Sequence, residues 1–232
     1  MSMRIALLLS GLAAWPGVVS LVAAQPAPIE VREDATFGGH PGTLRVGEDG
    51  VAFDAVDAKR SRHWTFAELR QLRVESSRRI VVETYRSRGW RGFGHSQTHE
   101  YRTTAPVEPA WVAAALSRIG RSVVTSVIPP QAAPAQFTVE VNHEGTDTAG
   151  RLALYAEGLA FETSRDGFAR FWRFTDLDAA LLQDRYRLQV AVYEGSREHV
   201  RPFLFTLKHD LPPGFYEQLW RQINRRPRQP AD

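Results

Sequence analysis

The sequence contains no cysteine among its 232 residues. Disulfides, thiolate metal sites, a cysteine nucleophile and a lipid-modified cysteine are therefore excluded. Packing must hold the fold together, which is feasible for domains of about 100 residues because they bury well over half of their unfolded surface. Lysine is scarce as well, since Lys59 and Lys208 are the only two and the other cations are arginine.

A strong charge of one sign is also missing, because the formal net charge is only +3. General nucleic-acid binding depends on a strongly basic face, so this balance argues against a nucleic-acid partner. The composition, 43% hydrophobic and 24% charged, is typical of a folded soluble protein. No constellation of catalytic residues stands out, which predicts a non-enzymatic protein without a small-molecule cofactor.

Long apolar runs are absent apart from one at the N-terminus. Arg4 is followed by the apolar residues 5–12, then by the breakers Pro16 and Gly17, and then by small residues that end at Ala24. This order predicts a secretory signal peptide over residues 1–24 and export to the periplasm or the extracellular space. The alternative is an uncleaved N-terminal membrane anchor, because about 20 residues can span a bilayer.

One repeat runs through the rest of the chain. An offset of 108 residues aligns residues 42–85 with 150–193 without a gap, and 12 of the 44 pairs are identical. About 3 identities would be expected from residue frequencies, so we infer a duplicated unit. The matched pairs include Gly50 with Gly158, Phe53 with Phe161, Trp64 with Trp172, Phe66 with Phe174, Leu69 with Leu177, Val82 with Val190 and Tyr85 with Tyr193.

After Tyr85 the offset becomes 104, which pairs Tyr101 with Phe205 and Ile119 with Ile223. The first copy therefore has about four extra residues between positions 86 and 99. Between the copies lies a proline-rich segment that we expect to be extended and semi-rigid. We predict a first domain over 25–128, a linker over 129–136, a second domain over 137–226 and a disordered tail over 227–232.

The periodicity within each copy is that of strands followed by one helix. Apolar residues alternate with polar ones around Ile80 and Val82 and again over 186–192, which indicates strands with one face inward. We expect glycine at the hairpin positions 50 and 158 because a positive φ costs glycine little. Each copy then changes to helical spacing after a proline, at 109 and at 213, so each domain should end in one amphipathic helix. The apolar helix residues are Trp111, Val112, Ala115, Leu116 and Ile119 in the first copy, and Phe215, Leu219, Trp220 and Ile223 in the second.

The order of these elements, with Gly-x-Leu and then Trp-x-Phe-x-acidic-Leu in both copies, resembles the pleckstrin-homology-like (PH-like) superfold, including its GRAM and bacterial branches. The second motif is carried by Trp64, Phe66, Glu68 and Leu69, and by Trp172, Phe174, Asp176 and Leu177. The resemblance covers nearly all of the chain after residue 24. It implies a mainly β fold of two tandem PH-like barrels, each with about seven strands and a C-terminal helix. It also implies, by analogy, a binding function for lipid headgroups, peptides or proteins.

The two tryptophans shared by the copies, Trp64 and Trp172, can be interpreted as ligand platforms or as buried anchors. They recur at equivalent places beside alternating apolar residues, and large aromatic residues in strands are mostly buried. We therefore predict that both belong to the cores of their domains.

The candidate binding residues lie in the insertion of the first copy, between residues 86 and 95. Arginine guanidinium groups on a glycine-rich loop could converge on an anion, and the aromatic rings could stack on it or enter a membrane interface. The alternative is a solvated hairpin whose aromatic residues fold back onto the domain. The candidates are Arg86, Arg88, Trp90, Arg91, Phe93 and His95.

A metal site at His95 and His99, with Glu100, is not expected. Residues four apart on an extended strand lie about 13 Å from each other, whereas metal bonds are near 2 Å. Scattered acidic pairs such as Asp176 and Asp178 are interpreted as turn and solvent-facing residues. The sequence thus favours an exported binding or scaffold protein that engages a protein or peptide partner in the cell envelope. The alternative is peripheral binding to an anionic lipid or glycan through residues 86–95.

Overall fold

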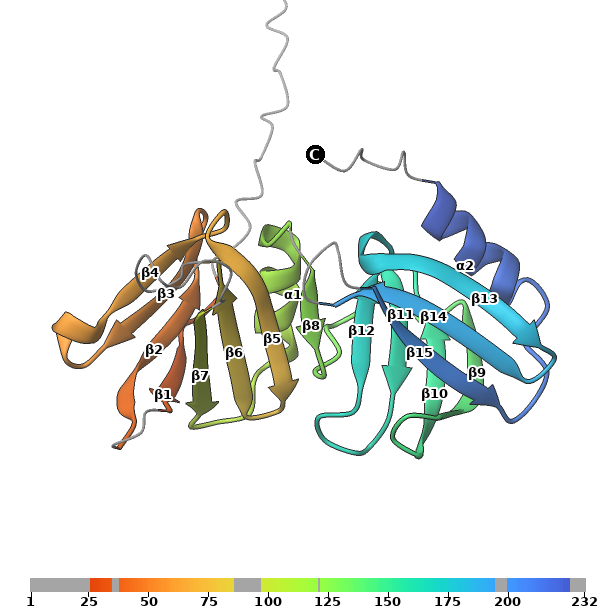
Figure 1. The fold of residues 1–232 in the computed structure, drawn as a ribbon, viewed down its shortest axis with the longest axis horizontal. Helices are drawn as coiled ribbons and strands as arrows, with labels where there is room; N and C mark the ends of the chain where they lie inside the picture. Colours follow the sequence, from red (N-terminus) through yellow and green to blue (C-terminus); the bar gives the residue numbers. More distant parts are fainter. Residues whose placement is uncertain (1–25, 35–37, 86–96, 121, 195–199, 226–232) are drawn as a thin grey trace, which may run out of the picture.

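The structure, a computed structural model, describes residues 26–34, 38–85, 97–120, 122–194 and 200–225. The chain is mainly β, with one sheet of eight strands, one of seven and two α-helices (Figure 1). The first sheet contains β1 (Ile29–Glu33), β2 (His40–Val46), β3 (Gly50–Ala55), β4 (Arg62–Thr65), β5 (Leu69–Ser76), β6 (Arg79–Thr84), β7 (Gln97–Thr103) and β8 (Val123–Thr125). The second sheet contains β9 (Phe137–His143), β10 (Thr148–Leu154), β11 (Gly158–Glu162), β12 (Arg170–Arg173), β13 (Leu177–Asp184), β14 (Arg187–Tyr193) and β15 (Val200–Leu207).

The two sheets have the same strand order. The first runs β4-β3-β2-β1-β7-β6-β5-β8 and the second runs β12-β11-β10-β9-β15-β14-β13. Their pairing also matches at the offset of 108 residues, since Val51 lies opposite Trp64 and Leu159 lies opposite Trp172. The register shifts recur as well, between Leu69 and Gln71 in β5 and between residues 177 and 179 in β13. Equivalent places in the two sheets can therefore be compared residue by residue.

The expected barrels do not close, so this part of the fold prediction was wrong. Closure requires the edge strands to pair with each other. The first sheet instead ends at β4 and β8, and the second ends at β12 and β13. The outer edge of β5 is taken by β8, and β12 lies beside β8 on its other side (Figure 1). In both sheets the two terminal strands are not paired with each other, so each sheet stays open.

Trp64 and Trp172 are buried in the two cores, as predicted. The reason given for the glycines was wrong, because neither Gly50 nor Gly158 has a positive φ. A Cβ at Gly50 would instead lie 2.0 Å from the carbonyl oxygen of Trp64, and one at Gly158 would lie 2.2 Å from that of Trp172. Each glycine is therefore required by the close approach of the strand that carries the tryptophan.

Each sheet has one helix, α1 (Pro109–Arg118) and α2 (Phe215–Asn224), as the periodicity predicted. Pro109 is the first residue of α1, where its missing N–H costs nothing. Phe215 and Leu219 of α2 are buried, but Trp220 is 52% exposed. The assignment of Trp220 to the apolar inner face was therefore wrong. None of the helices in the described ranges is long and apolar enough to cross a bilayer.

The two domains are joined through β8 and β12. Ala153, Ala160 and Phe171 of the second domain are buried in the same apolar cluster as the core of the first. Arg173, at the end of β12, donates hydrogen bonds from Nη1 to the carbonyl oxygens of Leu116 (2.7 Å) and Ile119 (2.9 Å) at the C-terminal end of α1. A cation at this end of a helix is favourable because the last carbonyls lack partners within the helix.

Arg173 also forms a two-pronged ion pair with Asp176, at 2.8 and 3.0 Å. Asp176 is buried, so its interpretation as a solvent-facing residue was wrong. The equivalent of Arg173 in the first domain is Thr65, at the same offset, so this contact belongs to the second domain alone. Arg173 thus links the domains through the two carbonyls of the first domain, while Asp176 of its own domain holds the guanidinium group in place.

We expect Arg173→Ala to lower the free energy of unfolding by about 3 kcal/mol, because the substitution leaves the carboxylate of Asp176 buried without its main partner. The matched control is Arg151→Ala, which removes an exposed arginine that makes a similar pair with Glu162. The control should cost at most about 1 kcal/mol, because surface ion pairs contribute little. Urea denaturation of both variants measures the difference, and equal losses would contradict this role of Arg173.

Candidate functional site

The predicted binding residues Arg86, Arg88, Trp90, Arg91, Phe93 and His95 lie outside the described residues. The structure describes the two strands that lead to them, with β6 ending at Thr84 and β7 beginning at Gln97. Anion or lipid binding through residues 86–95 therefore stays a prediction. The predicted signal peptide over 1–24 and the predicted tail over 227–232 also lie outside the described ranges.

His99, considered above beside His95, is buried on β7 within a polar cluster of the first domain. Its Nδ1 lies 3.5 Å from Oε1 of Glu33, and its ring lies 4.9 Å from that of Trp64. Arg62 pairs with the same carboxylate oxygen of Glu33. In the described residues no three of His, Cys, Asp and Glu are grouped to hold a metal ion.

Tyr101 belongs to the same cluster, and its side chain is fully buried. Burial, together with the nearby charge of Glu33, raises the pKa of Tyr101 above its ordinary value. The phenol therefore stays neutral at physiological pH. Arg62 thus offsets the charge of Glu33 within the same domain.

The second domain has a different set of residues at the equivalent places. Glu33 lies opposite Tyr101 across β1 and β7, and His143 lies opposite Phe205 across β9 and β15. The His143 ring packs 5.4 Å from the rings of both Phe203 and Phe205. Burial lowers the pKa of His143, and the positive charges of Arg201 and Arg170 lower it further. A neutral histidine thus stands where the first domain has a paired carboxylate.

The clearest surface difference between the domains lies at the outer edges of β5 and β13. In the first domain β8 pairs with β5 in parallel, with Leu72 opposite Val123 and Val74 opposite Thr125. In the second domain β13 is an edge strand, and within the described ranges no strand pairs with its outer side. We call this outer side of β13, over residues 178–184, the open edge.

The open edge exposes apolar side chains. Leu182 is 37% exposed, whereas Val74 at the equivalent place is fully buried. Leu181, its neighbour, is 53% exposed and holds the place of Arg73, which pairs with Glu75 at 3.2 Å in the first domain. An exposed leucine thus stands in the second domain where the first has a buried valine, and another stands where the first has an ion-paired arginine.

The main-chain polar groups at the open edge can be placed from two contacts. In the first domain the carbonyl of Val74 faces outward, because it accepts a hydrogen bond from the N–H of Ser126 at 2.9 Å. In the second domain the carbonyl of Ala180 accepts one from the Tyr216 hydroxyl of α2 at 3.1 Å. The N–H and C=O of one residue point to the same side of a strand, and residues two apart point theirs in the same direction. Ala180 and Leu182 therefore both direct their N–H and C=O groups to the open edge.

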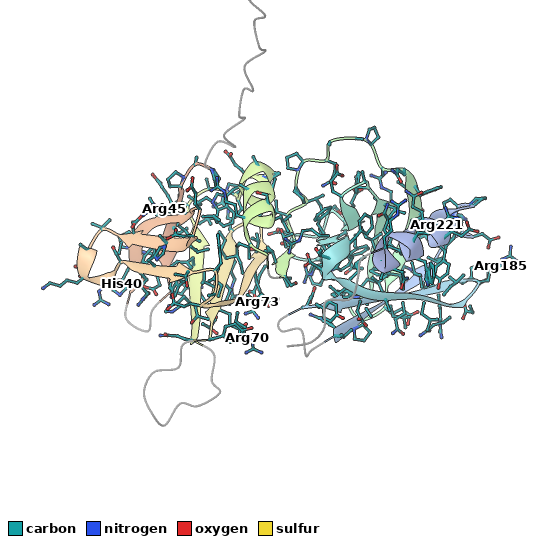
Figure 2. The ribbon with its side chains drawn as sticks, turned by 90° about the horizontal axis from the view of Figure 1, so that it is seen from above. His40, Arg45, Arg70, Arg73, Arg185 and Arg221 are labelled. Carbon is teal, nitrogen blue, oxygen red and sulfur yellow. The ribbon has the colours of Figure 1, made fainter. Side chains whose placement is uncertain are left out.

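α2 packs against β13, so the open edge has a helix beside it (Figure 1). A hollow of about 200 Å³ on this helix is lined by Tyr216, Glu217, Trp220 and Arg221. Figure 2 shows Arg221 and Arg185 at the end of the second domain that lies away from the first. Arg221 lies 3.5 Å from Glu217, and Arg185 pairs with Asp210. This end is therefore apolar at its centre, with charges of both signs around it.

A larger hollow of about 480 Å³ lies on the outer face of β9, β10 and β11. Its charged lining is paired internally, since Arg151 contacts Glu162 at 2.5 Å and Lys208 lies 3.9 Å from Glu140. It is open and mostly polar, so it offers little apolar surface to a ligand. The open edge with α2 is therefore the stronger candidate site. The alternation of apolar residues in the sequence did not reveal it, because the exposure of a strand edge depends on whether another strand pairs with that edge.

No family model matches the sequence, and no curated protein matches it. Among solved structures, one chain from the structure of the Spt16D Pob3N heterodimer is 12% identical, and the match covers 81% of this chain and 96% of that chain. Its TM-score is 0.28, which is too low to carry an argument about function. The described residues form two mainly β domains, each with one helix, and the PH-like resemblance stays a prediction.

The lowered pKa of His143 predicts a pH-dependent stability. Between the folded pKa and the unfolded value of 6.5, the unfolded chain binds more protons than the folded chain. The free energy of unfolding should therefore fall as pH is lowered through 6.5 and level off below the folded pKa.

The measurement compares urea denaturation of the wild type and His143→Phe from about pH 8 to pH 5. Phenylalanine matches the neighbouring Phe203 and Phe205 in shape and removes the titrating group. The free energy of unfolding of the variant should fall less than that of the wild type as pH is lowered. If the two plots of this free energy against pH are parallel, the assignment to His143 is wrong.

Proposed function

We propose that this chain is an exported, non-enzymatic binding or scaffold protein made of two tandem PH-like domains, divided as the sequence predicts. It engages a protein partner in the cell envelope, and an extended segment of the partner adds as a strand to the open edge of β13. The observation that carries this proposal is the difference between β5 and β13. One edge is filled by β8, whereas no strand of the described residues pairs with the equivalent edge, where Leu181 and Leu182 are exposed.

An unpaired strand edge favours a peptide partner for two physical reasons. Its row of outward N–H and C=O groups can form main-chain hydrogen bonds with any extended segment, while side-chain contacts supply selectivity. Proteins commonly protect such edges with charged residues or proline. The central residues of this edge, Ala180, Leu181 and Leu182, are neither charged nor proline, and the acidic residues Asp178 and Asp184 stand only at its ends.

The exposed aromatic residues beside the edge support the same function. Trp220 on α2 and Tyr186 in the turn after β13 are both about half exposed, at 52% and 48%. Tryptophan and tyrosine are enriched in protein interfaces because they bury a large apolar area and also carry a polar group. Burying them under a partner would remove apolar area from water, which is the main favourable term in association.

The envelope location rests on the sequence of residues 1–24, and the non-enzymatic character rests on the lack of a catalytic motif. The mixed charges around the open edge, with Glu217 and Asp210 beside Arg221 and Arg185, favour a protein partner over a uniformly anionic surface. The lipid or glycan alternative depends on residues 86–95 and needs a test of its own.

The test is to pan a library of random heptapeptides displayed on phage against the wild-type protein. Enriched peptides are then titrated against Leu182→Pro and Leu182→Ala. Proline removes the N–H that residue 182 presents to the open edge, and such a position on an edge strand tolerates proline. We expect Leu182→Pro to weaken binding at least about tenfold through the lost hydrogen bond and the altered strand geometry.

Leu182→Ala is the matched control, because it shortens the same side chain and retains the N–H. It should weaken binding less than the proline variant, and thermal unfolding should show that both variants fold. If no peptide is enriched, or if the enriched peptides bind Leu182→Pro as tightly as the wild type, strand addition at this edge is wrong.

A further inference from the structure

We infer that the partner segment lies parallel to β13 and carries the pattern apolar–apolar–Thr–Ser from its N-terminal to its C-terminal end. This inference rests on the proposed function, because it describes what the open edge binds. The template is within the same chain, where β8 fills the equivalent edge of β5. Val123, Val124, Thr125 and Ser126 are all buried there.

The direction follows from the matching shapes of the two edges. β5 and β13 pair with their inner neighbours in the same register and have register shifts at the same two places, the second between Val74 and Ser76 and between Leu182 and Asp184. A strand edge with the same bends presents its N–H and C=O groups in the same directions. The arrangement that satisfies β5 is a parallel strand, so the same arrangement fits β13.

The hydroxyl residues follow from contacts that β8 makes at its C-terminal end. Ser126 donates to the carbonyl of Val74 from both its N–H (2.9 Å) and its Oγ (3.0 Å). The Thr125 hydroxyl donates to the carbonyl of Val127 and accepts from the N–H of the same residue, at 2.8 and 3.1 Å. The serine thus adds a second hydrogen bond to the edge, and the threonine fixes the turn that ends the strand. Leu182 supplies the carbonyl that Val74 supplies in the first domain.

The apolar positions follow from the residues that lie opposite. In the first domain Leu72 lies opposite Val123, whereas the equivalent of Leu72 is the smaller Ala180. A segment on β13 therefore has room for a larger apolar side chain at its first position. Its second position lies beside the exposed Leu181, which favours another apolar residue.

Tyr216 contacts the part of β13 with which this segment would pair, so a substitution of Tyr216 tests the inference. Its hydroxyl donates to the Ala180 carbonyl, which a parallel strand must also use. Val112 holds the equivalent position in α1 and has no hydroxyl to compete with β8. A carbonyl oxygen can accept two hydrogen bonds, so an added strand shares this acceptor with Tyr216 and its own bond to the carbonyl is weaker.

The experiment uses a synthetic peptide of residues 122–128, flanked by lysines for solubility, and a control peptide of the reversed sequence. Each is titrated against the full chain, and a nitroxide label at either end of the bound peptide is located by the broadening of backbone amide signals. We expect the forward peptide to bind more tightly. Its N-terminal label should broaden signals near Leu177, and its C-terminal label should broaden signals near Asp184.

Tyr216→Phe should tighten binding of the forward peptide by at most about fivefold, because the added strand no longer shares the Ala180 carbonyl with a hydrogen bond worth roughly 1 kcal/mol. Equal binding of the two peptides, labels in the opposite orientation, or no effect of Tyr216→Phe would each overturn the inference. If peptides from the library bind at β13 while the 122–128 peptide does not, this inference fails and the proposed function stands. If no peptide binds at β13, both fail.

Discussion

The three residues of β8 determine how the two domains are joined. They pair in parallel with β5, lie beside β12 and follow directly on α1, so one short strand links both sheets and a helix. An edge strand presents polar main-chain groups that must find partners or face water. β8 satisfies the edge of β5, and Arg173 satisfies the last carbonyls of α1. The joint therefore combines main-chain groups of the first domain with the side chain of Arg173 and with apolar side chains of the second domain, such as Phe171.

The same backbone carries different chemistry in its two copies, and the difference points to a site. In the first domain Arg73 and Glu75 form an ion pair on the surface of β5. In the second domain their places are taken by the exposed Leu181 and by a glutamine. An isolated structural unit gains little from an exposed leucine, whereas a binding surface gains the free energy of burying it. The comparison within one chain thus selects this surface as the candidate site.

The interiors of the two domains also differ, at the place where β1 pairs with β7 in the first and β9 pairs with β15 in the second. The first domain has Glu33, Arg62 and His99 in contact, and the second has His143 among phenylalanines. Buried ion pairs cost desolvation and are often no more stable than well-packed apolar residues. Both solutions fit the same strand pairing because the main chain forms the hydrogen bonds of the sheet, while the enclosed side chains need only be mutually satisfied.

The sequence by itself determined the mainly β class, the equivalence of the two halves, the two helices and the burial of Trp64 and Trp172, because these depend on local periodicity and on recurring residues. Tertiary structure decided the rest. Gly50 is needed for the carbonyl of a neighbouring strand, and Trp220 is exposed because α2 turns it away from the core. The sequence of residues 123–125 resembles many other short apolar segments, so it does not show that they form a strand. Their pairing with β5 shows it, and no strand of the described residues pairs with β13 in the same way. The alternation of apolar and polar residues along the chain determines which face of a strand is apolar. Which strand pairs with a given sheet edge is determined by residues that are distant in the sequence.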